Sequence, residues 1–98
     1  MSIAYFRNRS TEDIAYRRET KSARNLLPAE LHEKAREKLA IINAAESLMD
    51  IHCFAGKRLE KLHGDRFGQY SIRINSKYRI CFKWKQGDAC DVEITDYH

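Results

Sequence analysis

The stretch QYSIRINSKYRICFKW, residues 69–84, decides the fold. Apolar and polar side chains alternate on both sides of residues 75–77, which predicts two β-strands, 69–74 and 78–84, joined by a tight turn. One face of this hairpin carries Tyr70, Ile72, Ile74, Tyr78, Ile80, Phe82 and Trp84, and the other carries Ser71, Arg73, Arg79, Cys81 and Lys83. The apolar face needs a cover, whereas the polar face can meet solvent or a ligand.

Further strands are expected on both sides of this hairpin. Residues 86–88 (Gln-Gly-Asp) predict a second turn, and residues 89–95 alternate again, with Val92 and Ile94 toward the core. Residues 58–62 could form a strand before the hairpin, and the apolar residues 2–6 predict an opening strand. We therefore expect an antiparallel-rich, twisted sheet of about four to five strands.

Helical patterns precede this sheet. Pro28 stands in the first turn of a helix expected to run from about Leu27 to Ala45, because apolar residues then recur at helical spacing. Shorter helices are expected over residues 11–17 and 47–51, a loop or frayed helix end over 17–25, and a loop over 52–56. Helices followed by an antiparallel meander indicate an α+β fold, with one domain over residues 1–98 and N-terminal helices covering one face of the sheet.

Charge and cysteine content restrict the functional classes. The net charge is +4, and residues 51–98 carry nine Lys and Arg against six Asp and Glu, so most of the excess lies in the C-terminal half. Such a basic half with interleaved aromatic residues suits a phosphate backbone, although an ordinary solvated surface looks the same. Three cysteines without CxxC spacing argue against a disulfide scaffold or a zinc site and favour a reducing cytoplasm. No signal peptide or membrane span is expected.

Three groups of residues could carry chemistry. Arg73, Arg79 and Lys83 would lie on the polar face of the hairpin, and the tripeptide Asp96-Tyr97-His98 follows a well-patterned strand. His63 enters a turn, and its imidazole could converge with that of His98. Motifs for nucleotide phosphates, metalloproteases and serine hydrolases are absent, and neither a metal nor a cofactor is expected.

The C-terminal half closely resembles the HigB branch of the RelE-type toxins, also called plasmid-maintenance killer proteins. The resemblance is carried by residues 58–75 (RLEKLHGDRFGQYSIRIN), 78–82 (YRICF) and 91–98 (DVEITDYH), and it extends upstream through 36–45. It implies a RelE-like fold and a toxin of a type II toxin–antitoxin system. The implied activity is ribosome-dependent, metal-independent cleavage of mRNA. The implied partners are a HigA-type helix-turn-helix antitoxin, the ribosome with mRNA, and operator DNA through the antitoxin complex.

Site residues follow from this resemblance position by position. The implied catalytic residues are Asp96, Tyr97, His98, Arg79 and His63. Relatives commonly carry Lys where this chain has His63, and some carry His where it has Glu60, so Glu60 becomes a possible catalytic residue. The residues expected to contact RNA are Arg73, Lys83, Lys61, Arg66 and Lys77.

The sequence is therefore compatible with two functions. The first is an endoribonuclease in which Arg73 and Arg79 offset phosphate charge and the histidines move protons. The second is a non-catalytic ribosome- or RNA-binding growth inhibitor, which the altered positions Glu60 and His63 keep in consideration. Mapping new 5′ ends of messages would separate the two functions.

Overall fold

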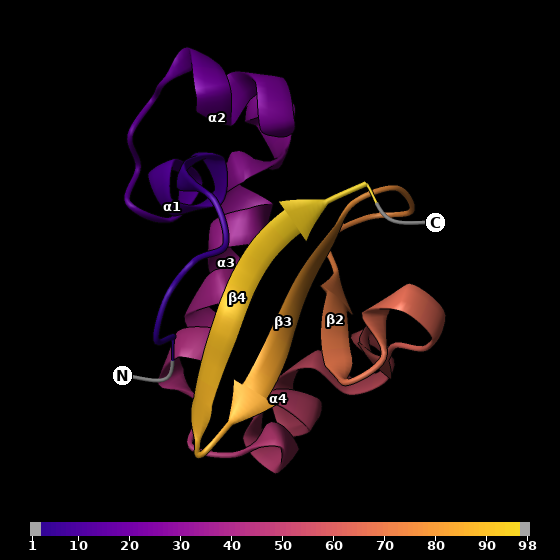
Figure 1. The fold of residues 1–98 in the computed structure, drawn as a ribbon. Helices are drawn as coiled ribbons and strands as arrows, with labels where there is room; N and C mark the ends of the chain where they lie inside the picture. Colours follow the sequence, from indigo (N-terminus) through magenta and orange to yellow (C-terminus); the bar gives the residue numbers. More distant parts are fainter. Residues whose placement is uncertain (1–2, 97–98) are drawn as a thin grey trace.

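The computed structural model describes residues 3–96, apart from the side chain of Lys57. Helices pack on one face of a four-stranded antiparallel sheet with strand order β1-β2-β3-β4 (Figure 1). The helices are α1 (Arg9–Ala15), α2 (Lys21–Leu26), α3 (His32–Ala44) and α4 (Leu48–Ala55), and the strands are β1 (Leu59–Lys61), β2 (Gln69–Arg73), β3 (Arg79–Lys85) and β4 (Asp88–Thr95). Short 3-10 turns are η1 (Ala29–Leu31), η2 (Gly56–Arg58) and η3 (Gly64–Arg66). The expected α+β fold is confirmed.

The central hairpin forms as its alternation predicts. Tyr70 pairs with Phe82 and Ile72 with Ile80 across β2 and β3. Ile72, Ile80 and Phe82 are fully buried, and each such side chain contributes roughly 1.5–3 kcal/mol through burial. The side chain of Asn75 accepts hydrogen bonds from the backbone N–H groups of residues 77 and 78 and closes the turn.

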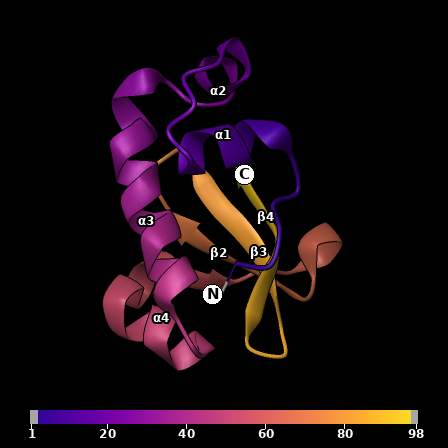
Figure 2. The ribbon, with the colours of Figure 1, turned by 90° about the vertical axis from the view of Figure 1, so that its left-hand side faces the viewer.

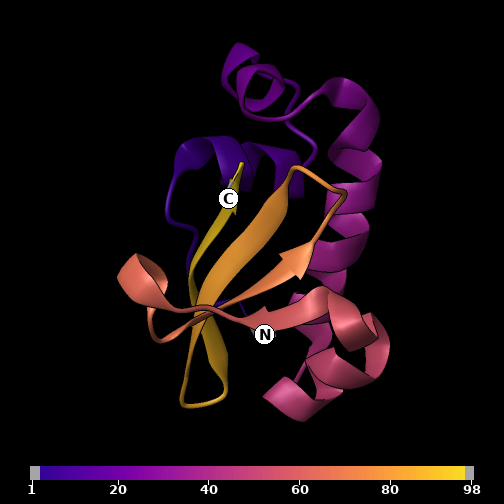
Figure 3. The same cartoon turned by 90° about the vertical axis from the view of Figure 1, so that its right-hand side faces the viewer.

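Helix α3 covers this apolar face. Its buried residues Ala35, Leu39 and Ile42 recur at helical spacing and point to the sheet. Figures 2 and 3, seen from opposite sides, show α3 and α4 on one side of the sheet and the turn η3 standing on the other. No helix formed by residues 3–96 is long and apolar enough to cross a bilayer.

Helix α1 fastens the N-terminal segment to the end of β4. It begins at Arg9, two residues before the expected start, because the side chain of Asn8 accepts a hydrogen bond from the N–H of Thr11 and caps the helix. The hydroxyl of Thr11 is buried and accepts a hydrogen bond from the N–H of Ile94 at 3.0 Å. This bond joins the first helix to the last strand, 83 residues apart.

Two segments expected as loops are helical. Residues 17–25 were expected to be a loop or a frayed helix end, but α2 forms there because the side chain of Thr20 accepts a hydrogen bond from the N–H of Ala23, which is buried. Residues 52–56 were also expected to be a loop, whereas α4 continues to Ala55, which is buried one turn after Ile51. Both helices were missed because a short helix is stabilised mainly by packing against the rest of the protein, which the helix propensity of its own residues does not reveal.

The opening strand expected over residues 2–6 is not a regular strand in its described part. Ile3 and Phe6 form two isolated parallel bridges to Ala89 and Val92 on the outer edge of β4. Asp91 lies between these two partners with φ +51°, at the bulge where the register of β3 and β4 shifts. The bulge interrupts the edge of β4, and a continuous ladder cannot form there.

Candidate functional site

The face of the sheet away from α3 carries a connected set of polar side chains. Register places Ser71 opposite Glu60 on one side and Cys81 on the other, and Arg73 opposite Arg79. Lys83 lies on the same face. Its partner on β2 is Gln69, and its partner on β4 is Cys90. The strands therefore bring Arg73, Arg79 and Lys83 to one face, as the alternation predicts.

Glu60 occupies the centre of the arginine pair. Its Oε2 lies 3.2 Å from Nη1 of Arg79, and its Oε1 lies 3.4 Å from Nη2 of Arg73. Nη1 of Arg79 also donates a hydrogen bond to Oγ of Ser71 at 3.4 Å. One carboxylate thus bridges two guanidinium groups, with one oxygen toward each. We name Arg73, Glu60 and Arg79 the arginine clamp.

Three of the other expected RNA-contacting cations, Arg66, Lys83 and Lys77, also face acidic partners. Nη1 of Arg66 lies 2.8 Å from Oε1 of Glu93, which also lies 3.5 Å from Arg7. Lys83 lies 3.4 Å from Asp91, and Lys77 lies 3.8 Å from Asp96. Positive and negative side chains therefore alternate on this face, and a carboxylate lies beside each of these cations.

The remaining sequence-predicted residues are distributed along the sheet. Asp96 directly follows Thr95, the partner of Arg79, and so lies at the end of the sheet that carries the arginine clamp. His63 is exposed and follows β1 beyond the opposite end of the β2–β3 pairing. Lys61 pairs with Tyr70, which places it on the helix-covered side, at the edge. The register thus separates His63 and Lys61 from the clamp, while Tyr97 and His98 lie outside the described residues.

The thiol at the centre of the face is inert. Cys81 is fully buried, and burial raises its pKa to about 11, with Glu93 adding to the rise, so the group is a neutral thiol at pH 7. Cys81 is therefore a packing residue. Within residues 3–96, no group of three or more His, Cys, Asp or Glu side chains could hold a metal ion.

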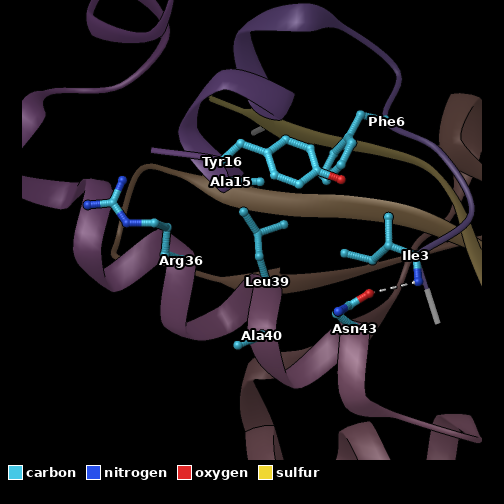
Figure 4. Close-up of a pocket in the computed structure, with 8 residues that line it drawn as sticks. All are labelled: Ile3, Phe6, Ala15, Tyr16, Arg36, Leu39, Ala40 and Asn43. Atoms are coloured by element: carbon cyan, nitrogen blue, oxygen red, sulfur yellow. Dashed lines mark hydrogen bonds between the residues drawn. The ribbon is translucent and has the colours of Figure 1, made fainter. Parts of the chain in front are cut away.

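A groove of about 370 Å³ lies on the other side of the molecule, between α1, α3 and the N-terminal segment (Figure 4). Its lining is mostly apolar: Ile3, Phe6, Ala15, Tyr16, Arg36, Leu39, Ala40 and Asn43. The guanidinium of Arg36 is engaged by Glu33 and by the backbone carbonyl of Ile14. The groove therefore offers little to a phosphate, and the polar face remains the candidate site.

The chain is similar to proteins of one family over most of its length. The family model of the RelE-like toxin of type II toxin–antitoxin system HigB matches residues 10–98. Toxin HigB-1 of Vibrio cholerae is 35% identical over 69 residues, covering 70% of this chain and 73% of that protein. Endoribonuclease HigB of Proteus vulgaris is 31% identical over 75 residues, covering 74% and 77% respectively. The resemblance seen in the sequence is confirmed, and the chain belongs to the HigB-like family of RelE-like toxins of type II toxin–antitoxin systems.

Proposed function

We propose that this toxin is an endoribonuclease that cleaves mRNA on the ribosome without a metal and thereby inhibits translation and growth. The arginine clamp is the observation that carries the proposal, because it presents two guanidinium groups around one anion-binding position. The relative from Proteus vulgaris that is named an endoribonuclease supports the same activity.

The chemistry sets three requirements. The 2′-hydroxyl must lose a proton, the negative charge that develops on the phosphorus must be offset, and the departing 5′-oxygen must gain a proton. Arginine suits the second task, because its planar fork binds two oxygens of one phosphate and it keeps its charge at all working pH values.

The clamp already binds an anion of the appropriate shape. The carboxylate of Glu60 places its two oxygens at the two guanidinium groups, as two oxygens of a phosphate would. Arg79 is the more buried of the pair, with 20% of its side chain exposed, against 49% for Arg73. A phosphate that displaces Glu60 would therefore gain its strongest contact from Arg79, where water competes least.

The proton carriers come from the chain end and from the clamp. His98 is proposed as general acid or base, Tyr97 as a stacking or positioning group, and Asp96 as the residue that orients them. Asp96 lies next to the clamp through the pairing of Thr95 with Arg79, which supports this assignment. Glu60, a member of the clamp, is proposed as a possible base, whereas His63 lies beyond the opposite end of the β2–β3 pairing and is not assigned to this reaction.

Partners follow from the family and from the charge. A toxin of a type II system acts with an antitoxin, and we propose a HigA-type helix-turn-helix protein that joins the toxin in repressing their operon by binding operator DNA. The net charge of +4 suits approach to the ribosome and its mRNA, and we expect the protein to act in the cytoplasm.

The experiment is induction of the toxin followed by mapping of new 5′ ends on cellular messages. Arg79→Ala and His98→Ala should each lower cleavage by about 100-fold or more, because each removes a group that stabilises the transition state. Lys34→Ala, which removes one exposed charge from α3, is the control and should cleave normally. Wild-type cleavage by either site variant would show that the assigned residue is not catalytic.

The same experiment tests a non-catalytic inhibitor, the second candidate. The observation that favours it is the carboxylate already seated in the clamp, because Glu60 competes with phosphate for both arginines. Stalled but intact messages after induction of the wild-type protein would support this binder and exclude the nuclease.

A further inference from the structure

A third arginine continues the row of the clamp across the sheet. Leu59 pairs with Ile72, so Arg58, one residue earlier, stands level with Arg73, which itself pairs with Arg79. Neighbouring strands lie about 5 Å apart, and the row therefore spans about 10 Å from the interior of the sheet to its β1 edge. Arg58 is exposed and forms no ion pair with any other residue of the described range 3–96.

The row ends at a cleft on the β1 edge. This cleft of about 660 Å³ is lined by the end of α4, the turn η2 and β2, through Cys53, Phe54, Ala55, Gly56, Arg58 and Arg73. Figure 3 shows α4 and the turn after it leading directly into the edge strand. Arg73 belongs to both the clamp and the cleft, so the two sites are continuous.

Phe54 leaves a large aromatic surface in this cleft. Its side chain is 76% exposed at the last turn of α4, although the same helix buries Ile51 and Ala55 against the rest of the protein. Exposed aromatic rings beside cations are the elements of sequence-tolerant binding of single-stranded nucleic acid: the rings stack on bases and the cations follow the phosphates.

We propose that this cleft is a second nucleotide subsite, which binds the nucleotide next to the one held at the arginine clamp. Its phosphate contacts Arg58 and Arg73, and its base stacks on Phe54. The inference rests on the proposed action on RNA, and it adds a site that extends the bound strand past the β1 edge. A base of any type would fit, because every base has a π-face and the cleft holds few groups that read base edges.

The first test measures binding of a fluorescein-labelled, 2′-O-methyl 12-nucleotide single strand, which cannot be cleaved, by fluorescence anisotropy at several salt concentrations. Phe54→Ala should weaken binding about 5- to 100-fold with little change in the salt slope, because stacking involves no counterion release. Arg58→Ala should weaken binding and also reduce the slope of log K against log salt by about 0.7.

Matched controls come from the same helix and the same charge type. Met49→Ala removes an exposed apolar side chain of α4 outside the cleft, and Lys34→Ala removes an exposed cation of α3. Both should bind like the wild-type protein. If Phe54→Ala matches Met49→Ala and Arg58→Ala matches Lys34→Ala, the subsite does not exist.

The second test uses the cysteine in the cleft of the unaltered protein. Cys53 is exposed, whereas Cys81 and Cys90 are buried, so iodoacetamide should modify Cys53 first. Saturating oligonucleotide should slow this modification several-fold, as followed by peptide mass mapping. An unchanged rate with RNA bound would show that the strand does not enter the cleft.

The outcomes separate this inference from the proposed function. Weaker RNA binding by Phe54→Ala together with normal message cleavage by Arg79→Ala would support the subsite and show that Arg79 is not catalytic. Cleavage that depends on Arg79 together with wild-type binding by Phe54→Ala would overturn the subsite alone.

Discussion

Replacing Glu60 by Gln tests whether this carboxylate excludes phosphate from the arginine clamp. Glutamine keeps the shape of the side chain and removes its charge, while its amide oxygen can still accept a hydrogen bond from one guanidinium. We expect tighter binding of RNA, because the clamp loses its internal anion.

The size of the effect follows from the geometry. The carboxylate oxygens lie 3.2 and 3.4 Å from the two arginines, so a phosphate bound there would sit within about 5 Å of the displaced charge. Repulsion at about 5 Å in water costs about 0.8 kcal/mol. In the wild-type protein a phosphate must also break two partly exposed ion pairs, at about 0.5 kcal/mol each, which raises the total cost to about 2 kcal/mol. Affinity should therefore rise between about 4-fold and about 20-fold.

The assay is the anisotropy titration with the uncleavable strand, run beside urea unfolding. Glu37→Gln is the control, because it removes one exposed negative charge from α3, on the helix side of the sheet. The free energy of unfolding should change by about 1 kcal/mol or less, since both ion pairs are partly exposed to solvent. Equal or weaker binding by Glu60→Gln would refute the reasoning. Tighter binding with slower cleavage would identify Glu60 as the base as well as the competitor.

Two further predictions concern stability. Thr11→Val should lower the free energy of unfolding by about 1–3 kcal/mol in urea, because the buried N–H of Ile94 loses its acceptor while the volume is unchanged; a loss below about 0.5 kcal/mol would show that another acceptor replaces it. Asp13→Asn should destabilise the protein at pH 7: hydrogen bonds, first from Thr20 and then from Arg18, lower the pKa of Asp13 below 3.8, so its stabilisation is complete above about pH 4 and is lost as the pH falls through the folded-state pKa. Urea unfolding at pH 7 and pH 3 should show the difference between variant and wild type shrinking at pH 3, and an equal difference at both pH values would contradict this assignment.

The sequence by itself determined the sheet and its two faces. The alternation over residues 69–84 permits only one register of the hairpin, because a shift of one residue would move Ile72, Ile80 and Phe82 from the core to solvent. The position of Arg73 and Arg79 on one face follows from the same pattern. The buried face of α3 also followed from the sequence, because apolar residues at helical spacing all lie on one side of the helix.

The tertiary structure alone decided what those arginines contact. Glu60 reaches them because β1 pairs with β2 in a register that sets Glu60 opposite Ser71, and residues 58–62 carry no alternation strong enough to fix that register. The helices α2 and α4 depended on burial of Ala23 and Ala55 by other elements of the fold. The pairing of β1 with β2 also places Arg58 level with the clamp, because strand pairing, and not distance along the chain, decides which residues are cross-strand neighbours.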